Sequence, residues 1–160
     1  MIIPDARGGQ LLRVGDPGQG VHLLFSTPAR PYGDDPALDI PVRAKGAWVD
    51  VSDLVRTMDG DGLAEFVSSL TDRSSSWSEP RTWQSSEGQL KISAQRSDSR
   101  IVLTWGMRAV VTGSEGCWRF ETVTSHESGH EVRELSGAFN ALLSEKPRKS
   151  LSRCRRASGA

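Results

Sequence analysis

A chain of 160 residues, of which 36% are hydrophobic and 25% charged, is long enough to form one globular core without disulfide bonds. Its apolar runs are much shorter than the roughly 20 residues that a membrane-spanning helix needs. Its first residues also lack the charged and then apolar pattern of a secretion signal. We therefore expect a soluble cytoplasmic protein that does not enter the membrane.

The formal net charge of zero conceals an uneven distribution of charge along the chain. Residues 145–160 hold six Lys and Arg and one Glu, so residues 1–144 carry 14 Lys and Arg against 19 Asp and Glu. An acidic body disfavours binding to nucleic acid, which needs clustered cations, and it favours a basic protein partner. Contact with nucleic acid is expected only through the basic tail, residues 146–156.

Composition divides the chain into three parts. Residues 1–20 contain five Gly and two Pro and are predicted to be a flexible N-terminal segment that buries little apolar surface. Residues 21–144 are predicted to form a single domain. Residues 145–160 are predicted to be a disordered basic tail. The two cysteines, Cys117 and Cys154, are too few for a disulfide framework and fit a reducing compartment.

The first half of this domain is predicted to contain strands followed by a helix. Residues 21–26 are a short apolar run, residues 27–39 are a surface loop rich in Pro and Asp, and residues 40–51 alternate as a strand pair broken near Lys45. A helix follows over residues 63–70, where apolar side chains recur at helical spacing (Leu63, Phe66, Val67 and Leu70).

The second half is predicted to be a strand meander that ends in another helix. Residues 90–95, 100–111 and 117–124 alternate between apolar and polar side chains, with short turns between them, and Cys117 is expected in the apolar core. An apolar stripe then marks a helix that ends by residue 143 (Val132, Leu135, Phe139 and Leu142). The predicted class is α+β, an antiparallel meander of about five to seven strands with two amphipathic helices packed on one face.

One segment resembles a known family, small uncharacterised bacterial proteins of an actinobacterial type. The resemblance covers about residues 40–143 and rests on an Arg-x-Trp-x-Ser-x-Glu-Gly-x-Leu pattern, here Arg81, Trp83, Ser85, Glu87, Gly88 and Leu90. The layout is also similar to immunity proteins that pair with wall-associated polymorphic toxins. The resemblance implies a toxin-neutralising role through protein binding.

Two interpretations of this segment remain open. In the structural one, Gly88 turns the chain, Glu87 pairs with Arg81, and Trp83 covers the edge of the sheet. In the functional one, a partner surface includes Trp77, Arg81, Trp83 and Glu87, because exposed Trp and Arg are common interface anchors. The structural interpretation is the favoured one.

His126-Glu127-x-x-His130 matches the H-E-x-x-H pattern of zinc hydrolases, in which two His on one helix face bind the metal and Glu activates water. Here Ser128 and Gly129 fill the spacer, and Gly disfavours a helix interior. The two imidazoles are therefore expected to lie on either side of a strand-to-helix junction and to diverge.

We expect a non-enzymatic domain that binds a basic protein, which the resemblance implies to be a toxin domain, and that needs no cofactor. The alternative is a zinc-dependent hydrolase in which His126 and His130 bind the metal and Glu127 is the base. The Gly-rich residues 15–20 do not suggest a phosphate loop, because they lack its Lys-Ser/Thr and precede a strand.

Overall fold

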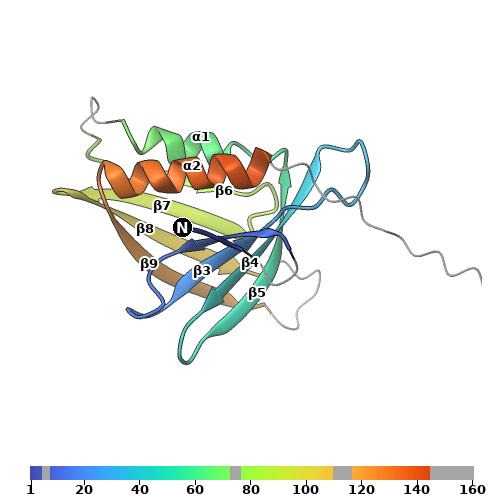
Figure 1. Cartoon of the computed structure of the whole chain (residues 1–160), viewed down its shortest axis with the longest axis horizontal. Helices are drawn as coiled ribbons and strands as arrows, with labels where there is room; N and C mark the ends of the chain where they lie inside the picture. The colour runs from blue at the N-terminus through green and yellow to red at the C-terminus, as the bar shows by residue number, and fades with distance from the viewer. Residues whose placement is uncertain (5–7, 73–76, 110–116, 145–160) are drawn as a thin grey trace, which may run out of the picture.

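The computed structural model describes residues 1–4, 8–72, 77–109 and 117–144. Within these residues the chain forms two antiparallel sheets and two helices (Figure 1). The first sheet has the order β1 (Ile2–Pro4), β2 (Gln10–Val14), β3 (His22–Ser26), β4 (Ala37–Lys45) and β5 (Asp50–Met58). The second has the order β6 (Arg81–Gln84), β7 (Leu90–Ser97), β8 (Arg100–Arg108) and β9 (Arg119–Glu127). The predicted class, α+β with antiparallel strands, is confirmed. The described residues form nine strands in two sheets, where one meander of about five to seven strands was predicted.

The helices, α1 (Leu63–Ser69) and α2 (His130–Ser144), pack against each other and lie side by side in Figure 1. Helix α2 also contacts β2 in the first sheet and β9 in the second, so it bridges the two sheets. Its apolar stripe recurs every three or four residues and is buried (Val132, Leu135, Phe139 and Leu142). No helix in the described part of the chain is both long and apolar enough to cross a bilayer.

One hydrophobic core joins both sheets and both helices. At its centre Phe25 of β3 packs against Phe139 of α2 and Trp105 of β8, with ring centroids 5.0 and 5.7 Å apart. The rings of Trp105 and Phe139 stack at 6.5 Å. Aromatic pairs at these separations add to the stability gained from burial, so the two sheets and α2 are held as one unit.

The two sheets also contact each other at two places outside the core. The side chain of Gln89, in the β6–β7 turn, accepts a hydrogen bond from the backbone N of Arg56 at 2.7 Å and donates to the Leu54 carbonyl at 3.0 Å. At the second place Gly15, directly after β2, lies so close to Thr124 of β9 that a Cβ at Gly15 would be 3.3 Å from Cγ2 of Thr124. The second contact brings the end of β2 next to β9.

Two predictions are wrong in detail. Residues 1–20 include β1 and β2, where a flexible segment was predicted, because Leu12 and Val14 alternate into the core and are 0% and 1% exposed. Cys117 is exposed and precedes β9, which begins only at Arg119. The predicted tail, residues 145–160, lies outside the described residues.

Candidate functional site

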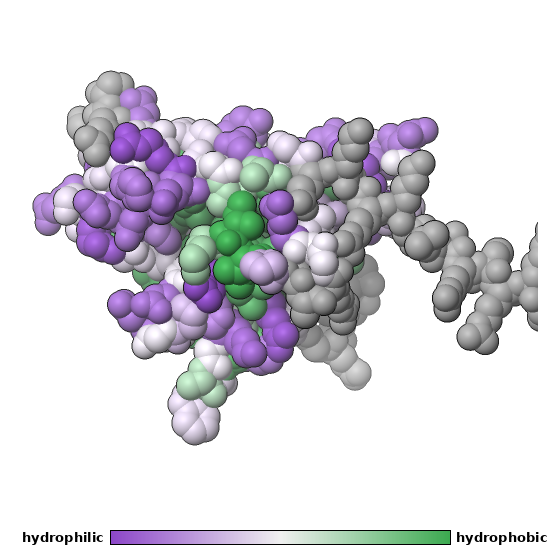
Figure 2. All heavy atoms as spheres, in the orientation of Figure 1, coloured by the Kyte–Doolittle hydropathy of each residue, from purple (hydrophilic) through white to green (hydrophobic). Residues whose placement is uncertain are grey.

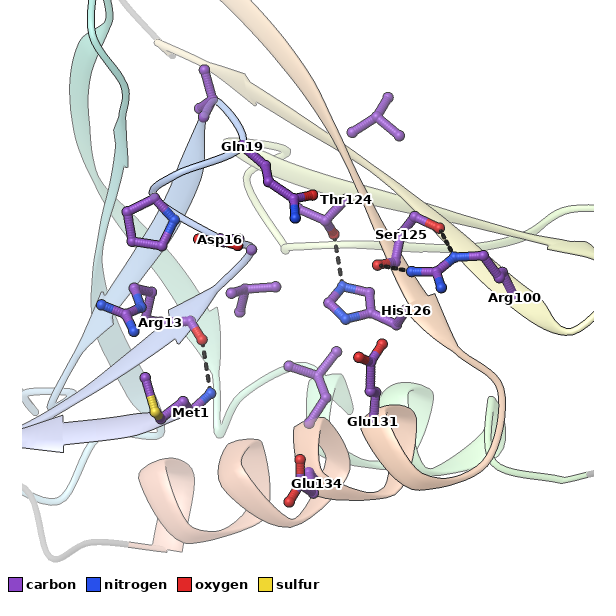
Figure 3. Close-up of a pocket in the computed structure, with 16 residues that line it drawn as sticks. Met1, Arg13, Asp16, Gln19, Arg100, Thr124, Ser125, His126, Glu131 and Glu134 are labelled. Carbon is purple, nitrogen blue, oxygen red and sulfur yellow. Dashed lines mark hydrogen bonds between the residues drawn. The ribbon is translucent and has the colours of Figure 1, made fainter.

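A polar cleft of about 610 Å³ opens where β2, the β2–β3 loop, β9 and the start of α2 meet (Figure 3). Strand alternation directs the cleft residues of β9 to their positions, since Thr124 and His126 are two residues apart and share one side of the strand. Charged and polar side chains from the other elements complete the walls (Arg13, Asp16, Gln19, Arg100, Glu131 and Glu134). The cleft therefore offers donors and acceptors of both charges.

His126 lies at the cleft end of a hydrogen-bonded chain that begins in the core at Trp105. The indole Nε1 of Trp105 donates to Oγ1 of Thr124 at 2.8 Å, and that oxygen lies 2.9 Å from Nε2 of His126. Burial lowers the pKa of His126; the carboxylate of Glu131 opposes this effect and the guanidinium of Arg100 reinforces it. The imidazole is thus kept neutral at neutral pH.

Two further cleft residues, Arg100 and Glu131, are held in place by hydrogen bonds to β9. The guanidinium of Arg100 donates from Nε to Oγ of Ser125 at 2.7 Å and from Nη2 to the Ser125 carbonyl at 2.9 Å. The carboxylate of Glu131 accepts a hydrogen bond from the backbone N of Glu127, which ties the first turn of α2 to the end of β9. These contacts hold the cleft in a defined shape before any ligand enters.

Thr124 and His126 place a hydroxyl beside an imidazole base, as in enzymes that use a hydroxyl as nucleophile. However, Thr124 is only 6% exposed, and its oxygen already accepts the hydrogen bond from Trp105. The hydroxyl is therefore held against the core. The geometry suits binding of a polar group better than attack on one.

The predicted strand-to-helix junction in the zinc motif is confirmed. His126 belongs to β9 and faces the cleft, whereas His130 is the first residue of α2, is exposed and lies 3.7 Å from Glu134. Glu127 is exposed at the end of β9. The ligand geometry of a zinc hydrolase, with both His on one helix face, is not formed. Among the described residues no three His, Cys, Asp or Glu are grouped to hold a metal ion.

The predicted partner residues have different environments. Trp83 is 8% exposed and its Nε1 donates to the Asp61 carbonyl at 2.8 Å, so it supports the chain just before α1. Arg81 lies over the half-buried ring of Trp77, 4.9 Å from its centroid. Glu87 is exposed in the β6–β7 turn. The structure brings Trp77 and Arg81 together, while Trp83 belongs to the core.

The exposed side chain of Trp48 was not predicted from the sequence. Trp48 is 98% exposed at the tip of the β4–β5 hairpin, whose turn is closed by the backbone bond from Gly46 N to the Val49 carbonyl at 2.8 Å. The turn of this hairpin lies next to the cleft, since a Cβ on Gly46 would be 3.1 Å from Cγ2 of the cleft residue Val21. A Trp directly after Gly46-Ala47, between two alternating runs, is the signal that could have located it.

An apolar strip adjoins the cleft on its other side. Figure 2 shows a green strip bordered by hydrophilic residues near the N-terminus that is marked in Figure 1. Met1 and Ile2, at this end of the chain, are 64% and 40% exposed, and Met1 also lines the cleft. The cleft thus lies between exposed apolar side chains and the Trp48 hairpin.

The chain belongs to DUF6228, a family of unknown function whose model matches residues 14–146. The match spans the second sheet, both helices and most of the first sheet, and it includes the cleft residues contributed by β9 and α2. No curated protein and no solved structure matches this chain.

Proposed function

We propose that the protein is a non-catalytic domain that binds another protein through Trp48 and the adjacent cleft. The observation that carries this proposal is the 98% exposure of Trp48 at the tip of a hairpin. A fully hydrated Trp gives no stability to the domain itself, whereas burial of its large ring in a partner contributes strongly to binding.

The hairpin is built to present this side chain. Below the turn, Arg43 of β4 and Asp50 of β5 form an ion pair in which Nε of Arg43 donates to Asp50 at 2.6 Å. The strands of the hairpin are paired residue by residue up to Lys45 and Asp50. Trp48 therefore sits on an ordered support, which reduces the entropy lost when a partner binds.

The cleft supplies the polar part of the same surface. Its mixed charges and neutral His126 suit a polar side chain of the partner, and the exposed Met1 and Ile2 offer apolar contact beside it. An interface with an apolar anchor and a polar rim is the usual arrangement in protein complexes.

The partner we propose is a basic protein, a toxin domain as in the immunity proteins that the sequence resembles. Residues 1–144 carry 19 Asp and Glu against 14 Lys and Arg, and this excess would steer a basic partner towards the domain. Binding would neutralise the toxin by covering its active surface in the cytoplasm, with no chemistry by this chain.

Co-expression with a basic toxin domain encoded beside its gene tests the proposal. The wild-type chain should form a complex with the toxin and restore growth, and Trp48→Ala should lose both effects while keeping its unfolding midpoint. Met58→Ala is a matched control, because Met58 is 48% exposed at the opposite end of β5 from the hairpin turn. A wild-type chain that neither binds nor protects, or a Trp48→Ala chain that does both as well as the wild type, would sink the proposal.

A further inference from the structure

A second hollow, of about 240 Å³, lies on the outer face of the second sheet, on a different sheet from the Trp48 hairpin. Its floor is Gly106, two residues before the end of β8. The strand register places Lys91 of β7 beside Gly106 on one side and Glu121 of β9 on the other, with Gln84 of β6 next to Lys91. Because neighbouring strands are about 4.8 Å apart, the walls at Lys91 and Glu121 are separated by about 10 Å.

The fold itself does not require glycine at position 106. A Cβ there would meet only Lys91, at 3.8 and 3.9 Å, which is ordinary van der Waals contact. Gly106 is also not among the described residues with positive φ. Glycine weakens a strand interior and often marks a place where a ligand approaches the backbone closely. The effect of Gly106 here is to leave the floor of the hollow open.

Three cations surround this floor, namely Lys91, Arg108 and Arg119. Arg108 is fixed in place, because its Nε donates to the Gly88 carbonyl at 2.7 Å. Gly88 allows this approach, since a Cβ at that position would be 2.5 Å from Nη2 of Arg108. Within the described residues, none of the three cations forms an ion pair.

Unpaired cations around a concave floor are unexpected in a body whose overall charge is negative. They repel one another, and an anion in the hollow would relieve that repulsion. Guanidinium groups match the oxygens of phosphate in pairs, and a Lys ammonium adds a further donor. The rim also contains Glu121, an acceptor that faces the cations across Gly106.

We propose that the Gly106 hollow binds a small phosphomonoester, with the phosphate held by Lys91, Arg108 and Arg119 and a hydroxyl of the ligand donating to Glu121. The volume suits a phosphate with a short organic chain and is below the range of larger cofactors. This site is independent of the protein-binding surface, and either proposal can fail without the other.

The test is an NMR titration of the full chain with inorganic phosphate and with glycerol 3-phosphate, at pH 7.5 and constant ionic strength. The backbone amide of Gly106 should shift and saturate with both ligands. Glycerol 3-phosphate should bind at least threefold more tightly than inorganic phosphate, and Glu121→Gln should abolish this difference, because the hydroxyl then loses its charged acceptor. Arg119→Gln should weaken both ligands at least tenfold, and Arg13→Gln, outside the hollow, should change neither.

Gly106→Val is the decisive variant, since it fills the floor with a residue that favours strands. Its thermal midpoint should equal or exceed that of the wild type, while its affinity for both ligands should fall at least tenfold. Three results would each overturn the proposal. They are amide shifts that rise linearly without saturation, equal affinity for acetate and phosphate, and binding by Gly106→Val that equals that of the wild type. Tighter binding of a short poly-Glu peptide than of glycerol 3-phosphate would also overturn it and would assign the hollow to an acidic protein.

Discussion

The hydroxyl oxygen of Thr124 lies 2.9 Å from Nε2 of His126, and these two residues couple the cleft to the core of the protein. The same oxygen accepts the indole hydrogen bond of the fully buried Trp105. A change at the cleft wall therefore reaches the aromatic centre of the fold through one hydroxyl group.

Thr124→Val should destabilise the fold even though the shape of the side chain is nearly kept. The substitution leaves the buried N–H of Trp105 without its acceptor, which costs about 1–3 kcal/mol. Urea unfolding followed by tryptophan fluorescence measures the change. Thr82→Val, on an exposed position of β6, is the control and should shift the free energy by less than about 0.5 kcal/mol. Equal effects of the two substitutions would contradict the role given to Thr124.

Stability should fall as the pH drops through 6.5. Burial lowers the pKa of His126 below its ordinary value of 6.5, and burial together with Arg13 lowers that of His22. From about pH 6.5 down to the lowered pKa values of the folded chain, the unfolded chain therefore binds more protons than the folded chain. The free energy of unfolding rises with pH through this range, and the stability that the two neutral imidazoles contribute is complete above about pH 7.5. Urea midpoints at pH 5.5, 6.5 and 7.5 measure this dependence.

The contribution of His126 can be separated by substitution. His126→Gln cannot take up a proton, so its urea midpoint should fall less between pH 7.5 and 5.5 than that of the wild type. His130→Gln, at the exposed start of α2, is the matched control and should keep the pH dependence of the wild type. A pH dependence that is the same in all three proteins would assign the effect to other groups.

The side chain of Asp61 links the end of β5 to the β6–β7 turn through hydrogen bonds. Its backbone has a left-handed conformation, with φ of 50°. Its carboxylate accepts hydrogen bonds from Met58 N at 3.0 Å, Ser86 N at 2.7 Å and Ser86 Oγ at 2.6 Å. Asp61→Ala loses these bonds and adds left-handed strain, for an expected cost of about 2–4 kcal/mol. Asp61→Gly loses the bonds alone and should be about 1 kcal/mol more stable than Asp61→Ala, as thermal or urea unfolding would show. If the Gly variant were the less stable, strain at this position would play no part.

The regular spacing of apolar residues in the sequence was enough to predict the helices and strands that bury one face. Leu63, Val67 and Leu70 occur at helical intervals and are each 1% exposed, so α1 could be read directly from the sequence. The β7–β8 hairpin was predicted for the same reason, since Ile92 and Leu103 belong to runs in which every second residue is apolar and buried. β2 was missed because its glycine-rich surroundings hide a five-residue alternation.

The site could not be predicted, because it depends on contacts between distant segments. The approach of Gly15 to Thr124, which creates one wall of the cleft, joins residues more than one hundred positions apart. Local sequence also does not distinguish Trp83, which is 8% exposed, from Trp48, which is 98% exposed. The difference arises because Trp83 faces the core from β6 while Trp48 occupies a turn that no described segment covers.

Removal of metal should leave the protein unchanged, which separates the binding proposal from the zinc hydrolase alternative. Zinc bound by His126 and His130 requires both imidazoles on one helix face, and the structure puts one on β9 and the other at the start of α2. Protein purified without a histidine tag should contain zinc well below one equivalent, and its unfolding midpoint should not change after treatment with a chelator. A zinc ion stabilises the folded state to which it binds. An unfolding midpoint that fell on chelation and recovered with one equivalent of zinc would therefore establish a metal site, provided that the His130→Gln variant showed neither change.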